Sequence, residues 1–132
     1  MAALDRPVAK PRPVYLNLFA IRLPLPGFTS ILHRISGALL FLVGIPFLLG
    51  VVQSSLASPD AWAAMRGTLG TPFAKLVLLA LAWASFHHLL AGLRHLLLDL
   101  HIGINLGPAR QSAAIMFVLA LLLTLAVAVK LW

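Results

Sequence analysis

The sequence predicts an all-α integral membrane protein, and two properties of the chain support this. Of its 132 residues, 61% are hydrophobic and only 10% are charged, which is too apolar for an ordinary soluble domain. Three apolar runs, at 35–59, 76–93 and 111–129, are longer than a buried core helix and match the length of about 20 residues that crosses a bilayer. We therefore expect three transmembrane helices in a single membrane domain comprising residues 1–132.

The first part of the chain is predicted to form an arm followed by a helix. Residues 1–27 contain five prolines, which interrupt regular helix, so this arm should run extended or lie along the inner membrane face. The first helix is predicted at about 29–53, with Thr29 or Ser30 as its N-terminal cap. Pro46 lies inside this helix and should bend it locally.

The remainder of the chain predicts two further helices. A polar segment rich in Ser, Gly and Pro follows the first helix, and we expect a short interfacial helix in it around Trp62. The second helix is predicted at about 72–101 and the third at about 110–131, joined by the turn-forming segment "GINLGPAR". The third helix has Met116 and Thr124 as its notable polar or ligating groups, so it should serve mainly for packing or lipid contact.

The net charge of +7 predicts a topology rather than a nucleic-acid partner. Seven of the ten basic residues lie near helix ends that meet on one side, which the positive-inside rule assigns to the cytoplasm. No aromatic residues interleave the N-terminal charges as a stacking platform for nucleic acid requires. Since no secretory or transit signal is recognisable, we expect a bacterial inner membrane with a cytoplasmic N-terminus and a periplasmic C-terminus.

The lack of cysteine narrows the redox chemistry available to the chain. It excludes disulfides, thiolate-held iron–sulfur clusters and a covalently attached c-type haem within this polypeptide. Histidine is the remaining side chain that commonly binds iron, and the sequence contains five of them.

The second predicted helix carries an unusual number of ionisable residues for a membrane segment. At about 100° per residue, its small, polar and ionisable side chains fall largely on one stripe. The residues of this stripe are Ser85, His88, Gly92, His95 and Asp99. Full charges facing lipid at the helix centre would cost about 2.5–3.5 kcal/mol each, so one shared stripe points to a buried functional face. His87 and Arg94 lie on a neighbouring stripe that could face a partner surface.

The first predicted helix presents a complementary face. Its members are Ser30, Arg34, Gly37, Phe41 and Gly44, with His33 beside them. The two glycines permit close helix packing. Simpler roles remain open for these groups: a single histidine can be a hydrogen-bonded core residue, Arg34 can be a snorkelling interfacial anchor, and Asp99 can pair with Arg94 or with a partner's arginine.

The depth of each histidine follows from an antiparallel arrangement of the two helices. If Ser30 and Asp99 are level, a rise of about 1.5 Å per residue puts His33 about 4–5 Å, His95 about 6 Å and His88 about 16 Å deeper in the membrane. On this expectation His33 and His88 cannot bind one iron, whereas His33 and His95 can. Geometry alone leaves the choice of ligand open.

Three motifs together resemble a known family. The segments "RPVYLNL", "SILHRISG" and "HLLAGLRHLLLDL" are similar to the cytochrome b membrane-anchor subunit of succinate dehydrogenase, respiratory complex II, in its large bacterial form. The likeness covers nearly the whole chain. It implies a helix bundle formed with a second small anchor subunit, with haem b bound between the two subunits and one axial histidine from each.

The resemblance also implies a role for individual residues. The axial ligand in this chain would be His88, four residues before Gly92, with the extra His87 as the one-residue alternative. Ser30 and Arg34 match positions that line the ubiquinone site next to the iron–sulfur subunit. The residues implied near the haem propionates or in a proton relay are His33, His95 and Asp99, with Arg34 also near the propionates. His101 has no counterpart.

The implied function is electron transfer to ubiquinone as part of a larger enzyme. A flavoprotein subunit would oxidise succinate and an iron–sulfur subunit would pass the electrons to this chain, which is not catalytic alone. Two alternatives stay open from the sequence: a haem-free structural anchor whose histidines only form hydrogen bonds, and the anchor of a quinol:fumarate reductase running in the opposite direction.

Overall fold

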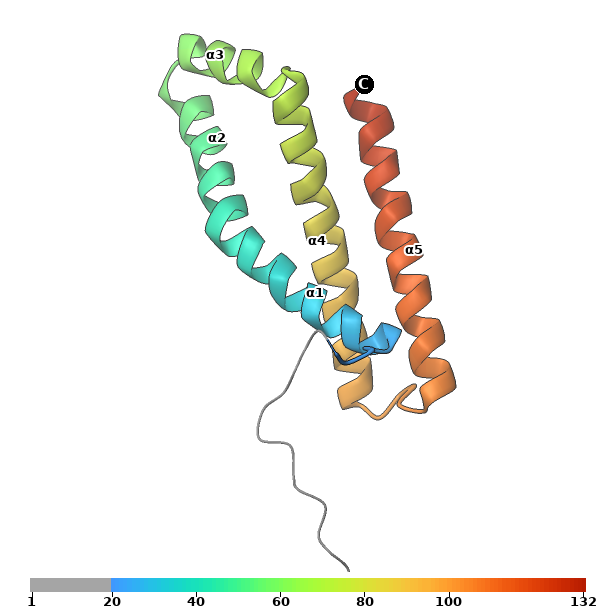
Figure 1. Cartoon of the computed structure of the whole chain (residues 1–132). Helices are drawn as coiled ribbons and strands as arrows, with labels where there is room; N and C mark the ends of the chain where they lie inside the picture. Colours follow the sequence, from blue (N-terminus) through green and yellow to red (C-terminus); the bar gives the residue numbers. More distant parts are fainter. Residues whose placement is uncertain (1–19) are drawn as a thin grey trace, which may run out of the picture.

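The computed structural model describes residues 20–132, so most of the predicted N-terminal arm lies outside the described residues. The described part consists of helices, with no strand, in the arrangement that Figure 1 shows. The elements are α1 (Leu25–Leu39), η1 (Leu40–Gly44), α2 (Ile45–Ala57), α3 (Pro59–Leu69), α4 (Pro72–Asp99) and α5 (Leu106–Leu131). Three segments are long and apolar enough to cross a membrane: Leu25–Ala57, Pro72–Asp99 and Leu106–Leu131. The predicted all-α membrane fold is confirmed.

The first span begins earlier than the sequence predicted. Its helix starts at Leu25, with Pro24 as the N-terminal cap residue and Pro26 in the first turn. Proline is compatible with the first turn because the amide hydrogens there have no partner within the helix. The sequence predicts Thr29 or Ser30 as the cap, but both lie inside α1, where the Thr29 hydroxyl donates a hydrogen bond to the Leu25 carbonyl 3.1 Å away.

Pro46 alters the first span in a specific way. The five residues immediately before α2 form a π-helical turn, η1, and Pro46 follows as the second residue of α2. Proline lacks an amide hydrogen and its ring collides with the carbonyl four residues earlier, so a wider turn here accommodates it. Figure 1 shows α2 leaning away from α4 beyond this point.

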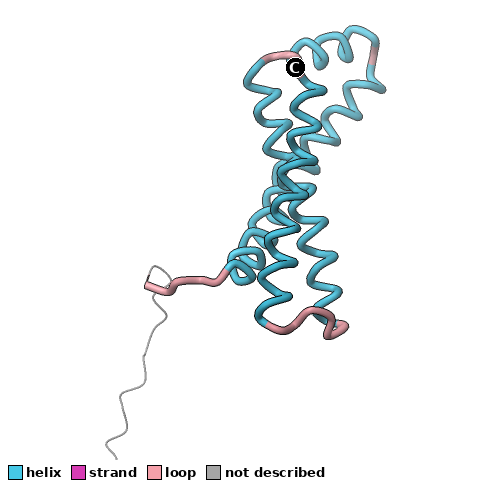
Figure 2. The backbone as a smooth tube through the Cα atoms, turned by 90° about the vertical axis from the view of Figure 1, so that its right-hand side faces the viewer, coloured by secondary structure: helices cyan, strands magenta, loops and turns pink. Residues whose placement is uncertain are grey.

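The connections lie at the two ends of the bundle, as Figure 2 shows. At one end, α3 joins α2 to α4, in the place where a short helix around Trp62 was expected. Ser58 caps α3, because its hydroxyl accepts a hydrogen bond from the Ala61 amide at 3.1 Å. The opposite end holds the start of α1 and the turn between α4 and α5.

The turn after α4 has a left-handed residue that is not glycine. His101 has a φ of 61°, and two hydrogen bonds close the helix end: His101 N–H to the Leu98 carbonyl at 2.9 Å and Ile102 N–H to the Leu97 carbonyl at 3.0 Å. These two bonds define a Schellman motif, in which glycine usually occupies the position of His101.

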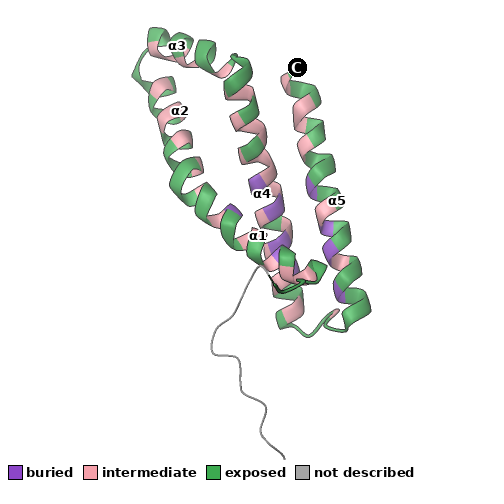
Figure 3. Ribbon diagram, in the orientation of Figure 1, coloured by how far each residue is buried: buried purple, intermediate pink, exposed green. Residues whose placement is uncertain are grey.

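The α4–α5 pair forms the best-packed part of the chain. The residues buried at this contact are mainly alanines, which let the two backbones approach closely. They are Ala84, Ala91, Ala109, Ala113, Met116 and Ala120. Figure 3 shows that the buried residues gather along α4 and the facing side of α5, while α2 and α3 carry none.

Candidate functional site

The helices α1 and α4 meet through two glycines, each facing a histidine of the other helix. A Cβ atom added to Gly37 would lie only 2.7 Å from Cε1 of His88, and one added to Gly92 would lie 3.3 Å from Nε2 of His33. Gly37 is therefore level with His88, and Gly92 with His33. This register is about one helical turn away from the expected one, in which Ser30 was level with Asp99.

The His88 ring is oriented by the backbone and a side chain of α1. Its Nδ1 lies 3.0 Å from the His33 carbonyl oxygen and 3.3 Å from the Ser36 hydroxyl, which itself donates to the same carbonyl at 3.0 Å. A carbonyl oxygen accepts but cannot donate, so Nδ1 carries the hydrogen. The lone pair of the ring is consequently on Nε2, for which no hydrogen bond is formed within residues 20–132.

Three imidazole rings lie in contact, and we call them the histidine cluster: His33, His88 and His95. The His33 and His88 rings stack with centroids 4.1 Å apart and planes 8° apart. The His33 and His95 rings are tilted, with centroids 5.1 Å apart. The expectation that His33 and His88 lie at well-separated depths is wrong, because the one-turn shift in register brings the two rings together.

The other predicted site residues lie toward the start of α1 and at the end of α4. Ser30 is half-buried, while Arg34 and Asp99 are exposed. No ion pair joins Asp99 to Arg94 or to any other residue in the part of the chain that the structure describes. At the other end of the predicted stripe, Ser85 is exposed, so the stripe contacts α1 only through its central residues.

The sequence suggests that His87 and Arg94 could face a partner surface, but the structure buries both side chains. The His87 side chain is fully buried, with its ring 5.1 Å from the rings of both Trp83 on α4 and Phe117 on α5. Arg94 is 6% exposed and donates from Nε to the Ser112 hydroxyl and from Nη2 to the Ala109 carbonyl, both at 3.0 Å. Both side chains are covered by α5, so the prediction that they face a partner is wrong.

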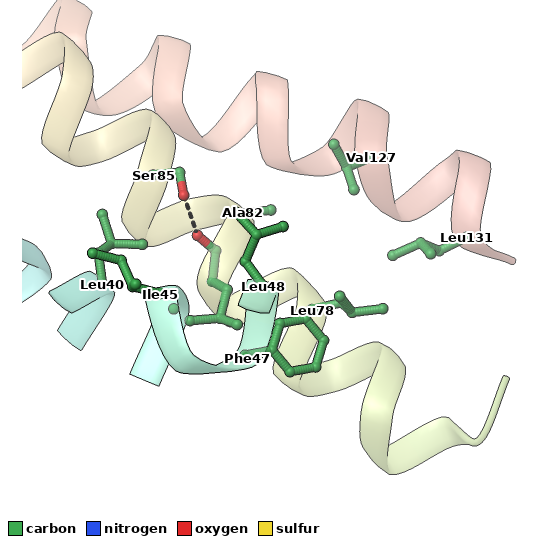
Figure 4. A pocket seen from close by; sticks show the side chains of 11 residues that line it. Leu40, Ile45, Phe47, Leu48, Leu78, Ala82, Ser85, Val127 and Leu131 are labelled. Carbon is green, nitrogen blue, oxygen red and sulfur yellow. Dashed lines mark hydrogen bonds between the residues drawn. The ribbon is translucent and has the colours of Figure 1, made fainter. Parts of the chain in front are cut away.

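An apolar groove of about 460 Å³ lies between the splayed α2, α4 and the end of α5, and Figure 4 shows its lining. Ser85 is the polar residue among those labelled there, and its hydroxyl donates to the Leu81 carbonyl at 2.8 Å. With that hydrogen already donated within the helix, the groove has little to offer a polar head group. The candidate site residues are therefore concentrated in the histidine cluster, toward the start of α1 and at the end of α4.

Comparison with known proteins identifies the family of this chain. The sequence model of the family "Succinate dehydrogenase/Fumarate reductase transmembrane subunit" matches residues 8–127. The chain belongs to this family. It is 35% identical over 102 residues to the succinate dehydrogenase cytochrome b556 subunit of Paracoccus denitrificans, covering 77% of this chain and 78% of that protein. It is 32% identical over 122 residues to the subunit of the same name from Coxiella burnetii, covering 92% and 97% respectively.

Family membership confirms the resemblance to the succinate dehydrogenase cytochrome b anchor and makes the chain a multi-pass membrane subunit of that type.

The sequence had not identified Ser36 or the His33 carbonyl as partners of His88. Ser36 could have been found from its position, since it precedes the glycine of "SILHRISG" and shares the packed side of α1. Ser112, which holds Arg94, was likewise missed.

Proposed function

We propose that this chain is the haem-binding and quinone-binding membrane anchor of a succinate:quinone oxidoreductase, with His88 as its axial haem ligand. The observation that carries the proposal is the orientation of the His88 ring. Because Nδ1–H is directed to the His33 carbonyl, Nε2 keeps its lone pair for a metal. A histidine bound to iron commonly donates its other ring hydrogen to a backbone carbonyl in this way.

The two glycines make room for the histidine rings. Gly37 has no side chain to press against the His88 ring, and Gly92 leaves room for the His33 ring, whose Nε2 lies 3.3 Å from where a Cβ atom would be. His87 fits poorly as the alternative ligand, since α5 and Trp83 enclose its ring completely. When bound, haem b would supply a one-electron reservoir whose potential depends on its axial ligands and burial.

A second subunit is needed to complete the iron coordination. Two axial imidazoles must direct nitrogens at each other across the metal, whereas the His33 and His88 rings lie face to face. We therefore assign the second axial histidine to the other small anchor subunit.

The quinone site is assigned to the inner end of α1. Ser30 and Arg34 are one helical turn apart and share a face, so both can approach the same bound molecule. The Ser30 hydroxyl can donate to a quinone carbonyl, and the Arg34 guanidinium can stabilise negative charge that develops on that oxygen during reduction. Ubiquinone is the proposed substrate, and electrons would arrive from the iron–sulfur subunit docked on the cytoplasmic side.

Reduction of a quinone to a quinol consumes two electrons and two protons, so the site needs a route for protons. Asp99 is exposed at the inner end of α4, and His95 lies one turn deeper, beside His33. This order suits proton delivery from the cytoplasm, or hydrogen bonding to haem propionates at the same level. A flavoprotein subunit would oxidise succinate, and the complex would sit in the bacterial inner membrane with the C-terminus in the periplasm.

The ligand assignment is tested by a redox difference spectrum of the complex purified with His88→Tyr or His88→Ala. We expect the bis-imidazole absorption to disappear or change, whereas His101→Gln, which alters an exposed residue outside the helices, should retain it. A normal low-spin haem spectrum in the His88 variants would rule the assignment out. A colourless wild-type complex would instead favour the haem-free anchor.

The quinone assignment is tested with Ser30→Ala and Arg34→Ala. Loss of one hydrogen bond to a charged or developing-charge group should lower quinone reduction by about ten- to a hundredfold. The haem spectrum and succinate oxidation with a water-soluble electron acceptor should stay unchanged. Loss of haem with normal quinone turnover would show that these residues serve the haem rather than the quinone.

A further inference from the structure

Arg94 is a buried cation without a counter-charge in the described chain. Its two hydrogen bonds go to neutral groups, the Ser112 hydroxyl and the Ala109 carbonyl, and within residues 20–132 it forms no ion pair. Its Nη1 group makes no hydrogen bond there either, so part of the guanidinium fork is unused. A charge removed from water is costly unless an opposite charge accompanies it, which indicates that an anion belongs beside Arg94.

A cavity adjoins this side chain and gives such an anion a place. It has a volume of about 340 Å³ and lies between the end of α4, the following turn and the start of α5. Its polar lining consists of the side chains of Arg94, Gln111 and Ser112. Its apolar lining includes Leu97, Ile102 and Ile115, each about half exposed on the surface that would face lipid.

The cavity is separate from the histidine cluster. Its lining comes from α4, the turn and α5, with no residue of α1. Arg94 is six residues from His88, which places the two side chains about 120° apart around α4. A haem propionate next to the histidine cluster would therefore be on a different side of the helix, and it does not account for the missing counter-charge.

We propose that the Arg94 cavity binds the phosphate group of an anionic phospholipid. Arg94 lies five residues before the end of α4, about 7–8 Å along the helix axis from that end. The guanidinium fork matches phosphate oxygens. The exposed leucine and isoleucine side chains of the cavity can be covered by the acyl chains of a lipid. A carboxylate of a partner subunit would pair with Arg94 but leave these apolar side chains uncovered.

The test uses the complete complex purified in mild detergent and washed extensively to remove loosely bound lipid. Native mass spectrometry and phosphorus analysis should find an anionic phospholipid retained by the wild type. Arg94→Gln should lose it, and the matched control Arg110→Gln, which removes an exposed positive charge at the same membrane surface, should keep it. Ile115→Trp, which fills the cavity without changing charge, should also lose it and serves if Arg94→Gln does not assemble.

Added lipid separates the possible sources of phosphate. Phosphatidylglycerol should raise the midpoint of thermal denaturation of the wild type and of Arg110→Gln by several degrees, and should not affect Ile115→Trp. Phosphatidylcholine and inorganic phosphate should have no such effect. Three results would each overturn the proposal. The Arg94 and Ile115 variants could retain as much lipid as the wild type, or inorganic phosphate could stabilise the wild type as much as phosphatidylglycerol does. In the third, the wild type neither retains anionic lipid nor is stabilised by it. The last result would point to a carboxylate of a partner subunit.

Discussion

Replacement of His87 by phenylalanine is expected to stabilise the protein, although this residue adjoins the proposed haem ligand. The His87 side chain is fully buried, and neither ring nitrogen has a hydrogen-bond partner within residues 20–132. Its ring is nearly parallel to that of Trp83, with an interplanar angle of 18°, and is tilted by 34° against that of Phe117. An aromatic hydrocarbon would keep both contacts and remove the unpaired nitrogens.

The magnitude follows from opposing effects. Each buried nitrogen without a partner costs about 1–3 kcal/mol, so the two together cost about 2–6 kcal/mol. Phenylalanine is slightly larger than histidine, and overpacking of a close-packed interior costs about 1–3 kcal/mol. The ring contacts with Trp83 and Phe117 are kept, so they contribute almost equally to the stability of the wild type and of the variant. The middle of each range leaves a net stabilisation of about 2 kcal/mol.

The assay is thermal unfolding of the purified complex, followed by circular dichroism, together with the haem spectrum of the same sample. His87→Phe should melt at a higher temperature and retain a normal haem spectrum, because the His87 ring packs against Trp83 and Phe117 on the side of α4 that α5 covers. His87→Gln is the matched control, since it keeps polar atoms at the same place and should not stabilise. A lower melting temperature or a loss of haem in His87→Phe would refute the reasoning. Either result would mean that a ring nitrogen of His87 forms a hydrogen bond or binds a metal in the complex.

Further predictions concern α1 and the turn after α4. Gly37→Ala should displace the His88 ring and reduce haem content, because the new methyl group would lie 2.7 Å from that ring; Gly50→Ala, with nothing within 4 Å, should leave haem content unchanged. Ser36→Ala should keep haem, since the His33 carbonyl still holds Nδ1, while destabilising the complex to thermal unfolding by about 1 kcal/mol. His101→Gly should raise the melting temperature through a gain of about 1 kcal/mol, because glycine adopts a φ of 61° without strain.

The sequence was sufficient to predict the three membrane helices, because long apolar runs and the distribution of prolines are local properties. It also predicted that His33 and His95 lie at a similar depth on facing helices, and their rings are 5.1 Å apart, whereas His88 was expected much deeper. The register between these helices was wrong by about one turn. Register is decided by which side chain fits against which glycine, here His88 against Gly37 and His33 against Gly92, and composition does not reveal that choice.

The sequence predicted packing or lipid contact for the third span and could not choose between the two, for a related reason. Its alanines look like filler in a hydropathy profile, since small apolar residues suit lipid contact and close packing equally well. In the structure Ala109, Ala113 and Ala120 are the contact surface for α4, and Ser112 and the Ala109 carbonyl hold Arg94. The sequence shows a polar stripe but not which neighbouring helix covers it.

The position of α5 restricts where a second anchor subunit can approach. It covers the side of α4 that carries His87 and Arg94, so a ligand from another chain cannot reach His88 from there. The open approach is along α1 and the splayed α2, where Phe41, Leu42 and Leu48 are each at least 60% exposed. The bend before Pro46 moves α2 away from α4 and leaves an apolar groove between them. We propose that an apolar helix of the second anchor subunit enters this groove.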